Sequence, residues 1–571
     1  MNIRRISALT IALSFLLSLT ACGGQGDSSQ GSASDAAPAA SDQSSGGASA
    51  AQSFSLGYYK GEGLHPYTCS NTTNQNLMGL IYEPLFAIDP TFATEPCLAK
   101  SCTIQVTSAS GSQAEKDQAD SSGDTSTGDT TGTDGTQTGD QTGQTDQSKQ
   151  QKAEEQPRSK ITGKTTCTIQ LRDDVTFSDG TSLSAEDVVY SLEQAQRKGS
   201  IYRERLSDVT DVTASGSTTV VIEVNAADAA FDSLLDIPII SCSGGSSPIG
   251  TGPYVLNTTK GKAVSLTRNT SWWQDGTLPA ETIDLYAADD SDMMIFGFGS
   301  DSISMVDTDL TGTNALSYTG DYNVVDYPTT SMIYVGCNTH SGPCQDQSFR
   351  QALYYVFDRD TLATKMLSGH AEPTVLPVSP KSKLYDEKLA ETYAWSEETA
   401  KKKLADGHYY NQTLKLIVNQ ESAFKTAFAE ELKKEMEAIG IKVQVEALAW
   451  DEFADALDER SFDLYLGEVK LKSSFDLTAV IGSNGNLNYG GYQNKDLEKL
   501  LTQFQTADKA TRATAAKNLY KAVADAAATI PLCFKNHSVL THWSANASIT
   551  PTQQNLFYHI AEWDLKWKQT P

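Results

Sequence analysis

The sequence predicts an α/β protein whose ordered part divides into two or three lobes. Strand-like and helix-like segments alternate along most of the chain. A strand, a helix and a second strand follow one another between residues 414 and 445. Such a unit is typical of a parallel sheet covered by helices. The 571 residues also exceed what one core usually organises, since domains hold about 100–200 residues.

The first 21 residues have the pattern of an export signal. Arg4 and Arg5 precede an apolar run over residues 6–19. This run is too short to span a membrane comfortably, and no later stretch approaches about 20 apolar residues, so we predict no transmembrane helix in the mature chain. Residues 19–22 read LTAC and resemble the bacterial lipobox. The resemblance implies that Cys22 carries a diacylglyceryl anchor, which two acyl chains make stable; an ordinary cleaved signal is the alternative.

Two segments have compositions that predict disorder. Residues 22–52 follow the signal and contain Gly, Ser, Ala, Gln and Asp without an aromatic residue, so we interpret them as a flexible tether. Residues 107–159 have a similar composition and are predicted to form a disordered insertion in the folded part. Because Asp follows Gly several times there, a calcium-binding repeat is the alternative, although the spacing is irregular.

Capping residues and hydrophobic periodicity define the regular elements. Ser184 and Asp187 form a capping box before a helix, and Asp346 caps another. Phe424 begins an apolar stripe of helical spacing that Gly440 ends. Further predicted elements are strands at 414–418, 441–445 and 462–466 and helices at 451–458 and within 494–527.

Eight cysteines besides Cys22 favour disulfides in an exported chain. Cys337 and Cys344 are the predicted pair, because the turn-rich segment between them can bring its ends together. A zinc site that adds His340 is the alternative, without an obvious fourth ligand. The word CTIQ occurs at 102–105 and 167–170 and predicts a β-hairpin with the thiols of Cys102 and Cys167 on one diagonal. At about 7–8 Å this diagonal exceeds disulfide reach, so we predict no bond there.

Charge and motifs exclude several functions. Asp and Glu number 71 against 44 Lys and Arg, a net charge of −27 that would repel nucleic acid phosphates. The sequence contains no GxSxG, HExxH, phosphate-loop or dinucleotide motif. We therefore predict a binding protein without a catalytic site, cofactor or bound metal.

Several segments resemble the solute-binding lipoproteins of bacterial ABC importers, in the class that binds peptides, dipeptides or nickel complexes. The most specific segment is LRDDVTFSDGTSLSAEDVVYSL at 171–192. Supporting segments occur in family order: LIYEPL at 80–85, GTGPY at 250–254, RQAL at 350–353 with Asp358 and Arg359, and NYGGY at 488–492.

The resemblance implies two mixed α/β lobes that close on a ligand about a hinge, with an extra subdomain on the first lobe. We expect lobe I with its subdomain at 53–330, lobe II at 331–532 and a return to lobe I at 533–571. It further implies capture of an oligopeptide-like solute, delivery to an ABC permease, and a monomer anchored outside the cell membrane. Burial of the ligand between lobes supplies contacts that exist only in the closed state.

Peptide-binding members often place an aspartate after a tryptophan, in a GWxxD segment, against the peptide ammonium. Here Glu468 stands at the tryptophan position and Leu471 at the aspartate position. The amine clamp is therefore not carried over, although Glu468 offers a nearby carboxylate and Lys470 and Lys472 suit an anionic ligand.

Candidate ligand-binding residues come from segments expected to leave strands at the lobe boundary, where aromatic rings give large contact area. They are Tyr58, His65, Tyr67, Tyr334, Asn338, Trp450, Gly467, Glu468, Val469, Lys470 and Tyr492. Each is alternatively structural, and Trp272 and Trp273 are interpreted mainly as packing. Alternative ligands are an oligosaccharide or a nickel or metallophore complex. An exported hydrolase, an adhesin and a folding factor are alternatives from other classes.

Overall fold

The computed structural model describes residues 54–108, 160–245, 247–312, 315–542 and 548–565. The predicted signal, Cys22 and the tether lie outside these residues, as do 109–159 of the predicted insertion. Strand β4 continues to Ser108, so the predicted start of the insertion at Thr107 was two residues early. Thr107 pairs with Lys164 and Ser108 with Gly163, which explains this extension.

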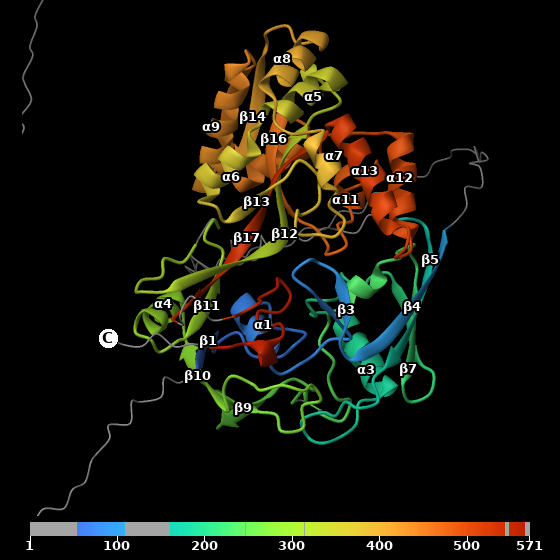
Figure 1. The fold of residues 1–571 in the computed structure, drawn as a ribbon, viewed down its shortest axis with the longest axis vertical. Coiled ribbons are helices and arrows are strands. Elements are labelled where there is room, and N and C mark those ends of the chain that lie inside the picture. The colour runs from blue at the N-terminus through green and yellow to red at the C-terminus, as the bar shows by residue number, and fades with distance from the viewer. Residues whose placement is uncertain (1–53, 109–159, 246, 313–314, 543–547, 566–571) are drawn as a thin grey trace, which may run out of the picture. The chain divides into compact units, whose positions relative to one another are not determined.

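The predicted α/β class with two mixed lobes is confirmed by an 11-stranded sheet of parallel and antiparallel pairs and by a four-stranded sheet (Figure 1). We call lobe I the part built on strands β1, β8, β9, β10 and β11, and lobe II the part built on β13 to β16 and the helices around them. Strands β12 and β17 are long neighbours that belong to both lobes. The large sheet contains β15 (Lys442–Leu448), β14 (Thr413–Asn419), β16 (Leu464–Lys470), β12 (Asn323–Cys337), β17 (Thr529–Thr541), β11 (Met305–Thr308), β1 (Ser55–Tyr59), β10 (Thr282–Ala288), β9 (Lys262–Arg268) and β8 (Tyr254–Thr259), with β13 (Ala371–Pro373) beside β17.

Lobe I carries an additional antiparallel sheet with strand order β4-β5-β7-β6. Its strands and the remaining elements of lobe I are β4 (Ala99–Ser108), β5 (Gly163–Leu171), β6 (Val209–Ala214), β7 (Thr219–Val224), the hairpin β2 (Phe86–Ile88) and β3 (Thr94–Pro96), and helices α1 (Thr72–Met78), α3 (Ala185–Gln196), η1 (Phe231–Leu234), α4 (Ser291–Gly299) and η3 (Ile560–Glu562). The predicted capping box of Ser184 and Asp187 begins α3. The C-terminal residues Leu556, Phe557 and Trp563 pack into the core of this lobe.

Lobe II contains the predicted strand, helix, strand unit. Its helices are η2 (Pro343–Gln345), α5 (Gln347–Val356), α6 (Arg359–Leu367), α7 (Glu387–Glu391), α8 (Glu397–Asp406), α9 (Ala423–Ala438), α10 (Trp450–Asp458), α11 (Thr478–Ile481), α12 (Lys495–Thr506) and α13 (Arg512–Ala526). Strands β14 and β15 are parallel, and α9 connects them. Asp346 caps α5 as predicted, by accepting a hydrogen bond from the backbone N–H of Phe349.

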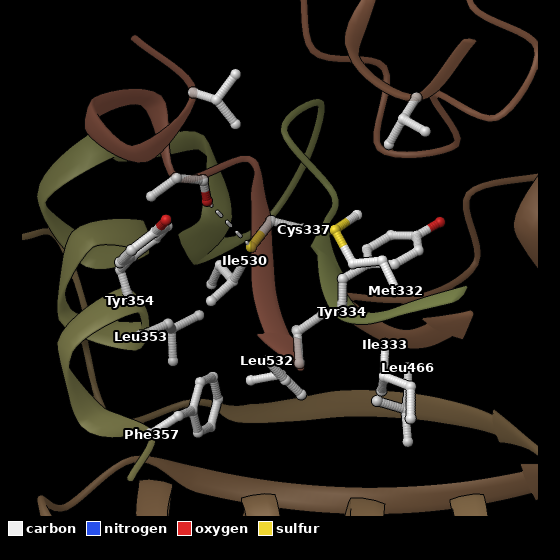
Figure 2. Packing of buried hydrophobic residues seen from close by; sticks show 14 of the residues in the cluster. Met332, Ile333, Tyr334, Cys337, Leu353, Tyr354, Phe357, Leu466, Ile530 and Leu532 are labelled. Atoms are coloured by element: carbon white, nitrogen blue, oxygen red, sulfur yellow. Dashed lines mark hydrogen bonds between the residues drawn. The ribbon is translucent and has the colours of Figure 1, made fainter. Parts of the chain in front are cut away.

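Buried side chains hold α5 against the strands that join the lobes. Leu353, Tyr354 and Phe357 lie beside Ile530 and Leu532 of β17 (Figure 2), and all five are at most 1% exposed. Removing such side chains from water contributes about 1.5–3 kcal/mol for each large apolar residue. The end of lobe II nearest β12 and β17 is thus rigidly packed.

The hairpin of β2 and β3 makes a further contact between the lobes. Phe92, at its tip, packs edge-on against Phe475 at 5.2 Å between ring centroids, and Phe475 packs against Phe534 at 5.7 Å. Phe92 and Ile88 are therefore buried in the core of lobe II, although their hairpin follows the chain of lobe I.

The predicted register of the CTIQ hairpin is confirmed, because Cys102 pairs with Ile169 and Ile104 with Cys167. The prediction that the two thiols lie out of reach is wrong: their sulfur atoms are 3.0 Å apart. The predicted distance applies to backbone positions, whereas twist shortens one diagonal and each sulfur lies one bond beyond its Cβ atom.

Candidate functional site

A large cleft lies between the lobes. It has a volume of about 3520 Å³ and receives side chains from both lobes and from β12 and β17. Among the regions that form its walls are the end of β1 with helix α1, the loops of lobe I at 82–97 and 201–208, helix α10, strand β16 and the C-terminal segment 553–560. Because segments far apart in sequence meet here, the cleft exists only when both lobes are folded.

Four alternating charges cross the base of the cleft. The Glu468 carboxylate of β16 lies 2.8 Å from the Nζ atom of Lys425 on α9 and 3.3 Å from that of Lys535 on β17. Lys535 also lies 2.5 Å from Asp309, which follows β11 in lobe I. Glu468 and Lys535 are 11% and 5% exposed, so the pair is shielded from water. We call Asp309, Lys535, Glu468 and Lys425 the charge chain.

The charge chain keeps Glu468 ionised. Burial by itself would raise the pKa of Glu468, but the charges of Lys425 and Lys535 outweigh burial and hold the pKa well below its ordinary value. In the same way, Glu468 and Asp309 outweigh burial and raise the pKa of Lys535. Since two lysines already neutralise Glu468, its carboxylate is not available to a ligand cation.

Lobe II presents an aromatic wall. Tyr465 donates a hydrogen bond to the hydroxyl oxygen of Tyr334 at 3.3 Å, and its ring lies edge-on to those of Tyr334 and Tyr489, at 5.7 and 6.0 Å. Trp450 and Phe453 lie one turn apart on α10, and their ring centroids are 6.0 Å apart. All five side chains line the cleft. Tyr465, Tyr489 and Phe453 were not among the predicted residues; the helical spacing of Trp450 and Phe453 was the signal for the last of these.

Lobe I contributes a second buried carboxylate, held by neutral donors. Glu83 accepts hydrogen bonds from the indole N–H groups of Trp272 and Trp273 at 3.0 and 2.8 Å, from Thr251 at 2.8 Å and from Gln274 at 3.1 Å. Burial raises the pKa of Glu83, and these hydrogen bonds offset only part of that rise. Trp272 and Trp273 were interpreted mainly as packing residues, but both line the cleft and their indole N–H groups bind Glu83.

Asp307 is a carboxylate of the cleft without a lysine or arginine partner among the described residues. It accepts a hydrogen bond from the hydroxyl of Tyr327 at 2.7 Å and one from Asn76 at 3.3 Å. The ring of His537 lies 3.9 Å away, and the Asp307 side chain is 11% exposed. Nothing in the local sequence distinguishes Asp307, because its neighbours come from α1, β12 and β17.

The comparisons with known proteins identify the family. The family model for bacterial extracellular solute-binding proteins, family 5 middle, matches residues 153–485, more than half of the 571 residues. The chain belongs to this family. The predicted family resemblance to ABC importer solute-binding proteins is thus confirmed. Its members are binding proteins that act outside the cytoplasm.

Curated relatives of this solute-binding protein are distant. The oligopeptide-binding protein AppA of Bacillus subtilis is 22% identical over 403 residues, which cover 62% of this chain and 73% of AppA. The nickel-binding protein NikA of Staphylococcus aureus is 24% identical over 380 residues, which cover 62% of this chain and 75% of NikA.

Solved structures agree with the fold. The substrate-binding protein CtaP of Listeria monocytogenes superposes with a TM-score of 0.64 at 19% identity, over 90% of this chain and 99% of CtaP. AppA of Bacillus subtilis in complex with a nonapeptide gives a TM-score of 0.52 at 18% identity, over 90% of this chain and 98% of AppA.

Six predicted ligand-binding residues line the cleft of this solute-binding protein: Tyr334, Trp450, Gly467, Glu468, Val469 and Lys470. Their contact with a ligand stays a prediction. The segment 467–470 was expected to leave a strand, but β16 continues through Lys470 because the β12 residues 331–334 pair with it. Gly467 is required there, since a Cβ atom would lie 2.7 Å from the ring of Tyr334.

The other five predicted residues lie outside the cleft lining. Tyr58 and Tyr67 are 5% and 2% exposed, and their hydroxyls donate to the carbonyls of Ala263 and Pro238. His65 is exposed beside Tyr67, with ring centroids 5.8 Å apart. Tyr58 faces away from the cleft lining on β1, an interior strand paired on both sides.

Asn338 and Tyr492 are likewise occupied by structural contacts. Asn338 is fully buried, and its amide donates hydrogen bonds to the carbonyls of Phe462 and Arg460 at 2.8 and 3.1 Å. The ring of Tyr492 lies 5.6 Å from the guanidinium of Arg350. Neither side chain is part of the cleft lining.

Cys337 and Cys344 are both buried. A hydrogen bond with Cys337 raises the pKa of the Cys344 thiol well above its ordinary value, so the two sulfurs are neighbours. Their disulfide stays a prediction. Among the residues that the structure describes, no three His, Cys, Asp or Glu side chains are grouped to hold a metal ion, which leaves the zinc alternative without support there.

No helix in the described ranges is both long and apolar enough to cross a bilayer.

Proposed function

We propose that this protein is the extracytoplasmic receptor of an ABC importer that captures an oligopeptide-like solute between its lobes and delivers it to the permease. Its role is reversible binding without covalent chemistry. Family membership supports the receptor role, and the oligopeptide-binding proteins among its relatives favour a peptide.

The size of the cleft carries the peptide proposal. Sites for drug-sized molecules usually have volumes of roughly 300–1,000 Å³, whereas this cleft measures about 3520 Å³. A single small solute would leave most of that space filled with water. An extended peptide reaches both the aromatic wall of lobe II and the polar groups of lobe I.

The ligand's ammonium group requires a carboxylate other than Glu468, which the charge chain neutralises. Asp307 fits this role because neutral donors surround it and it lines the same cleft. A peptide ammonium beside Asp307 would gain a charge-assisted hydrogen bond. The aromatic wall would then receive apolar side chains further along the peptide.

Closure would occur about β12 and β17, with lobe I at 53–330, lobe II at 331–532 and the return at 533–571.

The sequence also supports export by residues 1–21, a lipid anchor on Cys22, a tether to residue 52, and a monomeric receptor. Replacing Cys22 with Ala should release the protein from the membrane fraction. Membrane association that persists in Cys22→Ala would contradict the anchor.

A thermal-shift screen tests the function. The chain from Gly23 onward would be titrated with pools of tripeptides to nonapeptides, oligosaccharides and nickel–histidine complexes. At 100 times its dissociation constant a ligand adds about 2.7 kcal/mol to native stability, which raises the melting temperature measurably. A shift with peptides alone supports the proposal, and a shift confined to sugars or nickel complexes replaces the peptide by that solute.

The Asp307 role has a separate test. Asp307→Asn should weaken binding of a free peptide about tenfold or more, since hydrogen bonds to charged groups contribute roughly 1.5–3 kcal/mol. Binding of the N-acetylated peptide should change little. Glu95→Gln is the matched control, because Glu95 also lines the cleft and accepts a tyrosine hydroxyl at 2.7 Å. Equal losses for both peptides would show that Asp307 does not contact the ammonium.

A further inference from the structure

The closest pair of thiols in lobe I lies on the buried face of the four-stranded sheet. Cys102 of β4 and Cys167 of β5 point to the same side, as do Ile104 and Ile169, and their sulfur atoms are 3.0 Å apart. Cys167 is fully buried, whereas Cys102 is partly exposed. Two sulfurs at this separation need only a small side-chain rotation to bond.

The position of this pair in the chain is unusual. Ser108 at the end of β4 pairs with Gly163 at the start of β5. Cys102 therefore precedes residues 109–159 and Cys167 follows them. Strand β4 is also an edge of its sheet, where it pairs with β5. A covalent link at this point would join the chain before the insertion to the chain after it.

We propose that Cys102 and Cys167 form a disulfide that closes the base of the 109–159 insertion and keeps lobe I in one covalent piece when the insertion is cut. The bond suits a receptor that acts outside the cytoplasm, where disulfides persist. The composition of the insertion predicts disorder, and such segments are where proteases cut.

The bond forms by thiol–disulfide exchange with a disulfide-bonded oxidant, such as oxidised glutathione or an exported dithiol oxidase. The thiolate of the accessible Cys102 attacks one sulfur of the oxidant and expels the first thiol. The thiolate of Cys167 then attacks the Cys102 sulfur of the mixed disulfide and expels the second. Two cysteine thiols thus lose two protons and two electrons, and the oxidant is reduced to two thiols.

Non-reducing peptide mapping provides the direct test. The secreted chain, with Cys22 replaced by Ala, is alkylated under denaturing conditions, digested without reductant and analysed by mass spectrometry. We expect one linked peptide pair that contains Cys102 and Cys167. Alkylated Cys102 and Cys167, or either of them linked to another cysteine, would overturn the proposal.

A cleavage experiment tests the consequence. A specific protease site is placed between Gly128 and Asp129, and the cut protein is run on denaturing gels. The cut chain should migrate as one species without reductant and as two fragments with it. Cys102→Ser and Cys167→Ser should each yield two fragments in both gels, whereas Cys242→Ser, at an exposed cysteine, should behave as the parent. Two fragments from the parent without reductant would contradict the link.

Thermal unfolding separates this link from a merely structural role of the thiols. Reduction should lower the melting temperature of the parent by more than that of Cys102→Ser, because the predicted Cys337–Cys344 bond is reduced in both proteins. Cys102→Ala removes the thiol without introducing a hydroxyl and covers the case in which serine is poorly tolerated. Equal falls in melting temperature for the parent and Cys102→Ser, with linked peptides also absent, would exclude the disulfide.

Discussion

Glu83 and Glu468 are largely buried carboxylates on opposite lobes of one cleft. Different groups compensate each carboxylate for the water that it loses on burial. Glu468 lies between two lysines, which lower its pKa. Glu83 lies among four neutral donors, and its pKa is raised. A buried carboxylate beside opposite charges stays ionised. Hydrogen bonds from neutral donors pair its oxygen atoms, but they stabilise the charge less than water does, so its pKa rises.

The largest effect should follow from breaking the charge chain. Glu468→Ala leaves Lys425, whose side chain is 15% exposed, without a partner among the described residues. Removing one member of a buried ion pair costs about 3–5 kcal/mol. Urea unfolding measures this loss. The double variant Glu468→Leu with Lys425→Met should lose less, because Lys535 keeps Asp309. Equal losses for the single and double variants would mean that the ion pair itself does not determine stability.

A smaller loss is expected at the neutral network. Glu83→Gln keeps the shape of the side chain but turns an amide N–H₂ toward groups that are themselves donors. Leaving such a buried donor unpaired costs about 1–3 kcal/mol. The urea midpoint of Glu83→Gln should fall, with Lys499→Ala, an exposed ion-pair partner, as an unchanged control. An unchanged midpoint for Glu83→Gln would indicate that Thr251 or Gln274 reverses its hydrogen bond.

The smallest effect should occur at Glu435 on α9, a half-buried carboxylate that accepts one hydrogen bond at 3.1 Å, from the backbone N–H of Asp358. Burial raises its pKa from 4.5 to about 7. The native state therefore holds this proton more tightly than the unfolded state. The contribution of Glu435 to the free energy of unfolding is fully present below pH 4.5 and is lost as the pH rises to 7.

Glu435→Gln should accordingly raise the free energy of unfolding at pH 8 by about 1 kcal/mol, since water screens part of the pKa shift. At pH 5 it should change little. Unfolding curves at the two pH values check this, and a gain at pH 5 equal to that at pH 8 would rule out ionisation as the cause.

The sequence predicted the fold where the signals are local. The strand and helix periods of residues 413–448 and the cap at Asp346 involve neighbours in the chain. The end of β16 was missed because Gly467 reads as a strand breaker, whereas here it makes room for Tyr334.

The site was predicted less well. Trp450 and the segment 467–470 lie in the cleft, yet Tyr58 and Tyr67 have hydroxyls that serve backbone carbonyls. The charge chain joins residues from four separate segments, and no spacing along the sequence indicates that they lie close together. For the same reason, strand register was predictable between Cys102 and Ile169, but the sulfur separation was not.

The ladder between β12 and β17 has irregularities between Pro328 and Met332 and again between Ile333 and Tyr334. On either side, the two strands pair continuously. A regular two-stranded ladder resists bending in the direction of its hydrogen bonds, and a bulge lowers that resistance locally. We therefore predict that the most easily bent part of β12 and β17 lies within a few residues of the aromatic wall. A ligand that contacts this wall would act directly on the strands that join the two lobes.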